Sequence, residues 1–170
     1  ALVPGSAYGC SCLTLTLTDS MVGATVAGGL DSFAYGCQCA TTNVTRSTVL
    51  AHADAVGNTF SAAVATETGG EANSTLSARS TGDAGDARAW EALGSTALVE
   101  VTAVAEAPDA DAIVANGTTT VANSILVGNC SDVDSEGGNV VVLGSTCAGQ
   151  MTATNARVVA DPGLLPLADN

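Results

Sequence analysis

Lysine is absent from this 170-residue chain, and its basic side chains are four arginines and one histidine against 17 acidic residues. The resulting net charge of −13 repels the phosphate backbone of nucleic acids, so we expect no nucleic-acid partner. With so few general bases and cationic side chains, a site that stabilises an anionic transition state is disfavoured. We therefore predict that the chain is not an enzyme.

Aromatic residues are also scarce, at 3% of the chain. A narrow interior filled by small and branched side chains suits this composition better than a core built on large rings. No apolar stretch reaches the roughly 20 residues that a transmembrane helix needs, so we expect no membrane insertion. The sequence opens at Ala1 without the basic and apolar segments of a secretion signal, and we interpret it as a mature secreted product.

What the sequence does contain is a repeat. Residues 8–12 (YGCSC) return as 35–39 (YGCQC), which sets a period of 27 from position 8 to position 35. A second register, after the cysteines, keeps the same period and then shortens to 23 from position 100 to position 123; its members are 19–22, 46–49, 73–76, 100–103 and 123–126. A fixed period of about 20 to 50 residues is typical of chains whose units stack on one another.

Alternating or β-branched runs precede four of the five members of that register. These runs, at 13–18, 42–45, 97–99 and 119–121, have the period of two that predicts strands with one buried face. Gly-rich segments such as 26–29 and 67–70 are predicted turns, and 86–93 around Trp90 a short helical excursion. The sequence thus predicts an all-β fold, a parallel β-solenoid of about five to six rungs.

We expect one domain over residues 1–170. Within it, 1–12 form a partial N-terminal rung, 13–129 the regular rungs, and 130–170 a C-terminal rung with a terminal segment. Residues one period apart lie above one another at about 4.8 Å. This predicts two inward aliphatic columns, one of Val22, Val49, Leu76, Ala103 and Leu126, the other of Leu17, Val44, Leu98 and Val121. Glu71 falls in the second column, which predicts a register slip or a distorted third turn.

Six cysteines, an even number, indicate disulfide bonds and an oxidising compartment. Cysteines one period apart lie on adjacent rungs with Cα atoms about 5 Å apart, inside the disulfide range of about 4.4 to 6.8 Å. The expected pairs are Cys10–Cys37, Cys12–Cys39 and, across a shorter loop, Cys130–Cys147. A zinc site made of the first four thiolates is the competing interpretation.

The C-terminal third carries a resemblance to a known family. Segments 119–130 (TTVANSILVGNC), 138–140 (GNV) and 161–170 (DPGLLPLADN), together with Cys147, resemble secreted bacterial right-handed parallel β-helix proteins of the adhesin-like and polymorphic outer-membrane type. The resemblance is specific over 115–170 and weaker over 13–114. It implies a right-handed β-helix that is extracellular or at the cell surface.

In that family a sequence like 166–170 continues through a Gly-rich stretch into a segment like 1–7, which here opens the chain. The chain is then either a piece of a longer precursor or a subunit that joins its own copies head to tail. No cap is visible in the sequence at either terminus, and an uncapped rung can template another strand. We predict end-to-end stacking into a filament through Ala1, Leu2, Val3, Pro4, Leu165, Pro166 and Leu167.

The alternative function is a carbohydrate-binding or carbohydrate-cleaving β-helix, with a surface glycan as its partner. Calcium is the one cofactor we consider, because Asp132, Asp134 and Glu136 alternate like the oxygen ligands of a calcium loop. Leu143 stands where an EF-hand loop has its Glu, and a solvated acidic face is the competing interpretation. Among the Asn-x-Ser/Thr sequons, Asn116 is the best candidate for glycosylation because we expect it in a loop.

Overall fold

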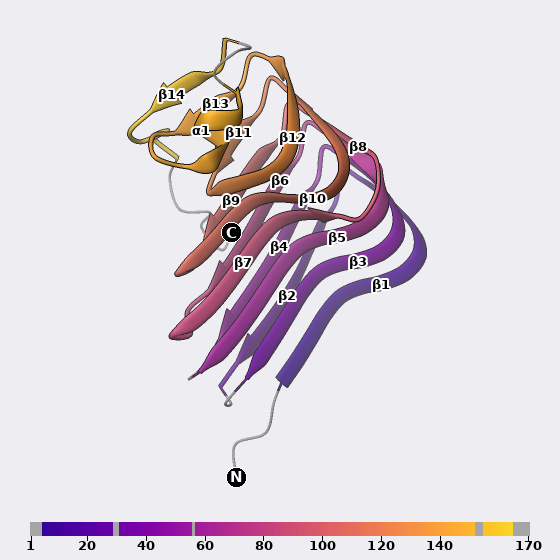
Figure 1. The fold of residues 1–170 in the computed structure, drawn as a ribbon. Helices are drawn as coiled ribbons and strands as arrows, with labels where there is room; N and C mark the ends of the chain where they lie inside the picture. The colour runs from indigo at the N-terminus through magenta and orange to yellow at the C-terminus, as the bar shows by residue number, and fades with distance from the viewer. Residues whose placement is uncertain (1–4, 29–30, 56, 152–154, 165–170) are drawn as a thin grey trace.

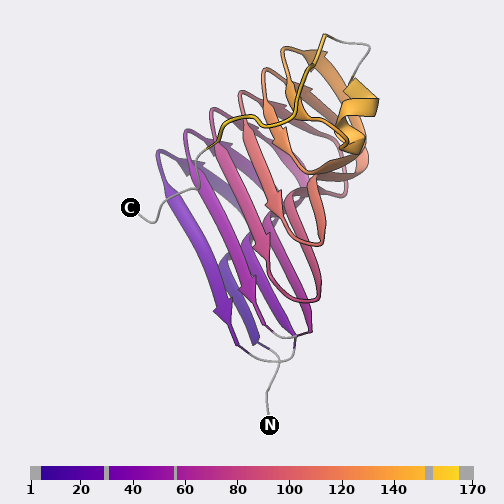
Figure 2. The ribbon, with the colours of Figure 1, turned by 90° about the vertical axis from the view of Figure 1, so that its left-hand side faces the viewer.

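The computed structural model of the chain describes residues 5–28, 31–55, 57–151 and 155–164, and it confirms the parallel β-solenoid (Figure 1). In Figure 1, β1, β3 and β5 cross the front of the molecule, and the strands that follow them return behind. Each turn is displaced from the previous one in the sense of a right-handed coil. Figure 2 shows the turns stacked along one axis, with the helix at one end.

Two parallel sheets make up the solenoid. The first contains β1 (Gly5–Thr18), β3 (Ser32–Thr45), β5 (Asn58–Ala72), β7 (Ala84–Ala92), β10 (Asp109–Ala122) and β12 (Asn129–Gly137) in that order, while β8 (Thr96–Val99) pairs with β5 and β10. The second contains β2 (Met21–Ala27), β4 (Thr48–Asp54), β6 (Thr75–Ser80), β9 (Thr102–Glu106), β11 (Ile125–Val127), β13 (Val140–Val142) and β14 (Arg157–Val159). The helix of the described residues is α1 (Thr146–Met151).

The period is constant at first and then shortens. Stacked turn residues such as Ser47 and Ser74 are 27 residues apart, and pairing from β2 to β9 keeps this predicted repeat over the first four turns. The separation then falls to 23 residues between Val101 and Ser124. It falls again to 15 residues between Ser124 and Asn139. The solenoid therefore becomes narrower toward its C-terminal end.

Five of the passages from the first sheet to the second are tight turns with one residue at positive φ. This residue is Asp19, Arg46, Asn73, Glu100 or Asn123, with φ between 47° and 55°. A buried serine follows at several of these turns: Ser47 Oγ donates to Thr45 O at 2.8 Å and accepts from Ser20 N at 3.2 Å. Such hydroxyls satisfy backbone groups that the turn removes from strand pairing.

Both predicted aliphatic columns are confirmed. Residue-by-residue pairing stacks Val22, Val49, Leu76, Ala103 and Leu126, and continues the column to Val141. The second column runs through Leu17, Val44, Glu71, Leu98 and Val121. Apart from those of the first rung, the aliphatic side chains of the two columns are at most 1% exposed, so they form the continuous core of the solenoid.

Two segments differ from the sequence interpretation. Residues 67–70, predicted as a turn, belong to β5, and 86–93, predicted as a helical excursion, lie almost entirely in β7. Parallel pairing with β5 on one side and β10 on the other satisfies the backbone of β7, which explains why the strand prevails over a helix. Trp90 pairs with Val64 and Ile113 in those strands and is fully buried, so its ring fills the interior.

Glu71 keeps its place in the second column, between Val44 and Leu98, so the predicted register slip at this position was wrong. The alternative, a distorted third turn, is present just before it: β5 pairs with β7 at a separation of 26 residues, as for Val64 and Trp90, but with β8 at 27. Its side chain is 3% exposed, and neither carboxylate oxygen has a hydrogen-bond partner among the described residues. Burial away from water disfavours the ionised form and raises the pKa of Glu71 well above its usual value. Backbone pairing on both sides thus holds an acidic side chain in an apolar column.

This burial makes the stability of the fold depend on pH. Between the unfolded and the folded pKa of Glu71, the folded state holds a proton that the unfolded state has lost. The free energy of unfolding therefore falls as pH rises from about 4.3, and this contribution levels off above the folded pKa. We expect Glu71→Gln to abolish this decrease of the free energy of unfolding with rising pH. Glu71→Leu should also abolish it and should stabilise the protein by about 2 to 3 kcal/mol at neutral pH.

Thermal unfolding of the wild type and both variants, from about pH 4 to about pH 8, measures this difference. The other carboxylates are common to all three proteins, so the difference in free energy of unfolding between wild type and Glu71→Gln isolates the contribution of Glu71. A difference that stays constant across this pH range would contradict a raised pKa of Glu71.

Candidate functional site

All three predicted disulfides are present. Cys10–Cys37 and Cys12–Cys39 join adjacent rungs with Cα separations of 4.6 and 4.7 Å, and Cys130–Cys147 has a Cα separation of 4.7 Å. The alternative of a four-thiolate zinc site was therefore wrong, because no described cysteine is free. Three disulfides indicate an oxidising environment.

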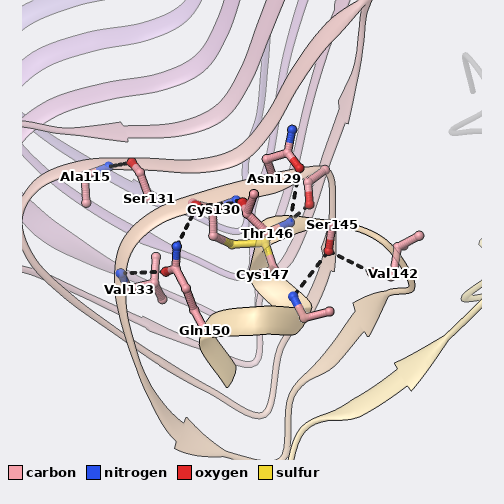
Figure 3. Close-up of a disulfide and its surroundings, with 12 residues drawn as sticks. Ala115, Asn129, Cys130, Ser131, Val133, Val142, Ser145, Thr146, Cys147 and Gln150 are labelled. Carbon is pink, nitrogen blue, oxygen red and sulfur yellow. Dashed lines mark hydrogen bonds between the residues drawn. A yellow bond between two sulfur atoms is a disulfide. The ribbon is translucent and has the colours of Figure 1, made fainter. Parts of the chain in front are cut away.

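The C-terminal end of the first sheet is covered by α1, which we call the C-terminal cap (Figure 3). Cys147 ties the cap to Cys130 of β12, and Met151, the last residue of α1, is fully buried. Gln150 Nε2 donates to Cys130 O at 2.8 Å, and its Oε1 accepts from Val133 N at 3.3 Å. The expectation that neither end is capped was therefore wrong at this end, because side chains of α1 satisfy the outer backbone groups of β12.

Thr146 adds to the cap at the start of the helix. Its Oγ1 lies 2.8 Å from both Cys130 N and Cys130 O, and its backbone N–H donates to Asn129 Oδ1 at 3.2 Å. These contacts replace the hydrogen bonds that a further strand would make along this edge. A six-residue helix without a long apolar face gives little signal in the sequence, so this helix was not predicted.

The opposite end of the solenoid is open. Strands β1 and β2, which we call the first rung, each pair with one strand, β3 or β4, in the described part of the chain. Inward side chains that are at most 1% exposed on the next rung, such as Val44 and Val49, have partly exposed counterparts here in Leu17 and Val22. Leu13 and Met21 are 83% and 62% exposed. The first rung thus presents both backbone edges and apolar side chains to solvent.

The first rung also lacks the usual protection of an edge. Neither Gly5–Thr18 nor Met21–Ala27 contains a charged residue or a proline, although the chain carries a net charge of −13. Edge strands of soluble proteins are commonly protected by charges, prolines or a covering element. Within the described ranges, the first rung therefore has the chemistry of a pairing surface.

A ladder of rings runs along the outer face of the first sheet. Tyr8 stacks on Tyr35 with centroids 5.2 Å apart and planes 4° apart, and Phe60 follows at 5.4 Å from Tyr35. Arg88 continues the ladder, 5.0 Å above the Phe60 ring. Burial, followed by the charge of Glu91, raises the pKa of the Tyr35 hydroxyl. Tyr8 is 52% exposed at the open end, beyond which the ladder has no further ring in the described residues.

Arg88 is the centre of the charged part of this face. Its guanidinium contacts Asp86 at 2.7 Å and Glu91 at 2.8 Å. Asp111 pairs with Arg88 across β10 and β7. Burial is the main reason that the pKa of Asp111 is raised, and the charges of Asp109 and Asp86 add to it while Arg88 opposes it.

The predicted calcium ligands do not converge. Asp132, Asp134 and Glu136 are all exposed along β12, and no group of three or more acidic, histidine or cysteine residues in the described ranges could hold a metal ion. The reason is the strand itself, which separates alternate side chains by about 6.6 Å. The calcium prediction was therefore wrong for these residues.

Asn116 is exposed, as glycosylation requires, but it lies within β10 rather than in a loop. Pairing between β10 and β12 is interrupted there, from Val114 to Thr119, which leaves this stretch on the surface. The residues predicted to form the assembly ends, Ala1, Leu2, Val3, Pro4, Leu165, Pro166 and Leu167, lie outside the described residues.

Comparison of the chain with protein-family models, with curated proteins and with solved structures found no match. The resemblance to bacterial β-helix proteins is thus supported at the level of the fold, a parallel β-solenoid. Within the described ranges, no helix has the length and apolar character that crossing a membrane requires.

The disulfide of the C-terminal cap can be tested by removing it. We expect Cys130→Ala/Cys147→Ala to cost about 3 kcal/mol, because a crosslink of this sequence separation, 17 residues, restricts the unfolded chain by about that amount. Amide hydrogen exchange should accelerate in α1 and β12 and stay slow in β3 and β4. The control Cys12→Ala/Cys39→Ala should cost a similar amount but leave exchange in α1 unchanged. Equal exchange in α1 in both variants would contradict the capping role.

Proposed function

We propose that this chain is a structural, extracellular β-solenoid that joins a second copy of itself through its open first rung. The observation that carries the proposal is the absence of charge from that rung in a chain of net charge −13. Two such copies repel one another unless the surfaces that meet are free of like charges. The disulfides support a secreted, extracellular location.

The two ends differ in a way that favours contact between first rungs. In a head-to-tail filament, the 14-residue strand β1 would meet the narrow C-terminal end, where α1 occupies the edge of the 9-residue strand β12. Two first rungs instead match in width, and contact between them, which we call the joint, places both Tyr8 rings at the same interface. Closed, two-fold contacts of this kind are the commonest in homo-oligomers. A filament would need a further contact, for which the outer edge of β14 in the second sheet is available.

The joint can be tested with charges placed on the edge strand. We expect the wild-type chain to form dimers in light-scattering chromatography, and Thr14→Lys/Thr16→Lys to be monomeric, because four lysines would then face one another across the joint. The control Thr41→Lys/Thr45→Lys adds the same charge to the same face of β3, one rung inward, and should remain dimeric.

Electron microscopy separates the two arrangements. Discrete rods of two solenoids support contact between first rungs alone. In long fibres, the orientation of successive subunits distinguishes head-to-tail stacking, with all copies in one direction, from first-rung pairs joined through β14, with alternating directions. Monomers of the wild-type chain at every concentration would refute self-association. The disulfides lie within the chain, so we expect one chain length on a non-reducing denaturing gel.

A further inference from the structure

A hollow of about 400 Å³, which we call the outer hollow, lies on the outer face of the first sheet. Its position follows from one column of stacked residues, in which Ala65 pairs with Gln38 on one side and Glu91 on the other. The small side chain of Ala65 leaves a gap between two longer ones. The disulfide Cys12–Cys39 also lines the hollow.

Several polar groups line the outer hollow without a partner. The side chains of Gln38 and Glu67 and the hydroxyl of Tyr35 make no side-chain hydrogen bond to any described residue, and Gln38 and Glu67 are exposed. Glu91 differs, because Arg88 holds its carboxylate at 2.8 Å. The free groups include an amide, a carboxylate and a hydroxyl, so both donors and acceptors are available to a ligand.

The lining also has an apolar part. Leu93, at 57% exposure, borders the hollow together with Ala40 and the disulfide. A volume of a few hundred Å³, with apolar walls and a few convergent polar groups, is typical of small-ligand sites. The hollow lies on the side of the solenoid and therefore does not depend on the proposed joint at its end.

The charges around the outer hollow restrict the ligand. An anion would meet Glu67, Glu91 and the field of a chain with net charge −13. A cation would be attracted by Glu67 and by the net charge, but it would find the carboxylate of Glu91 already paired and the guanidinium of Arg88 beside it. A ligand with many hydroxyl groups and apolar C–H faces satisfies both parts of the lining without carrying charge. We propose that the outer hollow binds an uncharged saccharide, with Gln38 and Glu67 as its hydrogen-bonding residues.

Saturation-transfer NMR tests the proposal in any state of assembly. The probes are the uncharged hexasaccharides of β-1,4-glucose, mannose, xylose and N-acetylglucosamine, with oligogalacturonate as the anionic probe and putrescine as the cationic one. We expect at least one uncharged hexasaccharide to bind at millimolar concentration or below, and neither charged probe to compete with it.

Matched variants locate the site. Gln38→Ala should weaken binding roughly tenfold, since it removes a hydrogen-bonding side chain, and Glu67→Ala similarly. Asn43→Ala, another exposed amide on β3 but outside the hollow, should bind as wild type. Ala65→Trp should abolish binding by filling the hollow, whereas Ala97→Trp, at an exposed position on β8, should not. Thermal unfolding of each variant shows whether the fold is kept.

Three outcomes would overturn the proposal. The first is that no uncharged hexasaccharide binds the wild-type chain at millimolar concentration. The second is that binding persists in a folded Ala65→Trp variant, which would place the saccharide elsewhere. The third is that putrescine binds and is lost with Glu67→Ala while the saccharides do not bind, which would identify an amine site.

Discussion

Backbone pairing between successive turns is the interaction on which the rest of this structure depends. In a parallel stack with a fixed register, every position is repeated above itself at about 4.8 Å. A side chain type that suits its position therefore recurs on successive turns as a column, as with Val49 between Val22 and Leu76. In the same way, cysteine stacks on cysteine and tyrosine on tyrosine. The stacking of side chains in the core, of the cysteines and of the rings on the outer face therefore follows from one backbone register.

The register also tolerates residues that the core does not favour. Glu71 lies in an aliphatic column without a hydrogen-bond partner in the described residues, yet pairing continues on both sides of it. A slip by one residue would turn every side chain of that strand to the other face, and its cost over β5 exceeds that of one buried, protonated carboxyl. The pH dependence of stability that we expect arises from this compromise between backbone and side chain.

The repeat explains which features could be predicted from the sequence. The solenoid, its columns and the disulfides Cys10–Cys37 and Cys12–Cys39 were predicted correctly, because equal spacing in sequence becomes vertical stacking in space. The third disulfide, Cys130–Cys147, was predicted correctly because these were the two remaining cysteines. Trp90 was assigned to a helix because propensity is local, whereas its strand is held by partners on both sides. The C-terminal cap was missed because it depends on Gln150 and one disulfide rather than on periodicity. Calcium binding was predicted from alternation on one strand, which separates ligands instead of gathering them.

The shortening of the repeat makes the two ends of the solenoid different in width. As the turns become shorter, the paired part of the second sheet shrinks from the seven residues of β2 to the three of β13. A six-residue helix is enough to cover the narrow end, and here it satisfies the backbone of β12. A first rung with a 14-residue strand needs a partner of similar width, and no short segment of this kind can provide one. The strands of the first rung carry no charge, and this is why we propose another broad β-rung as their partner.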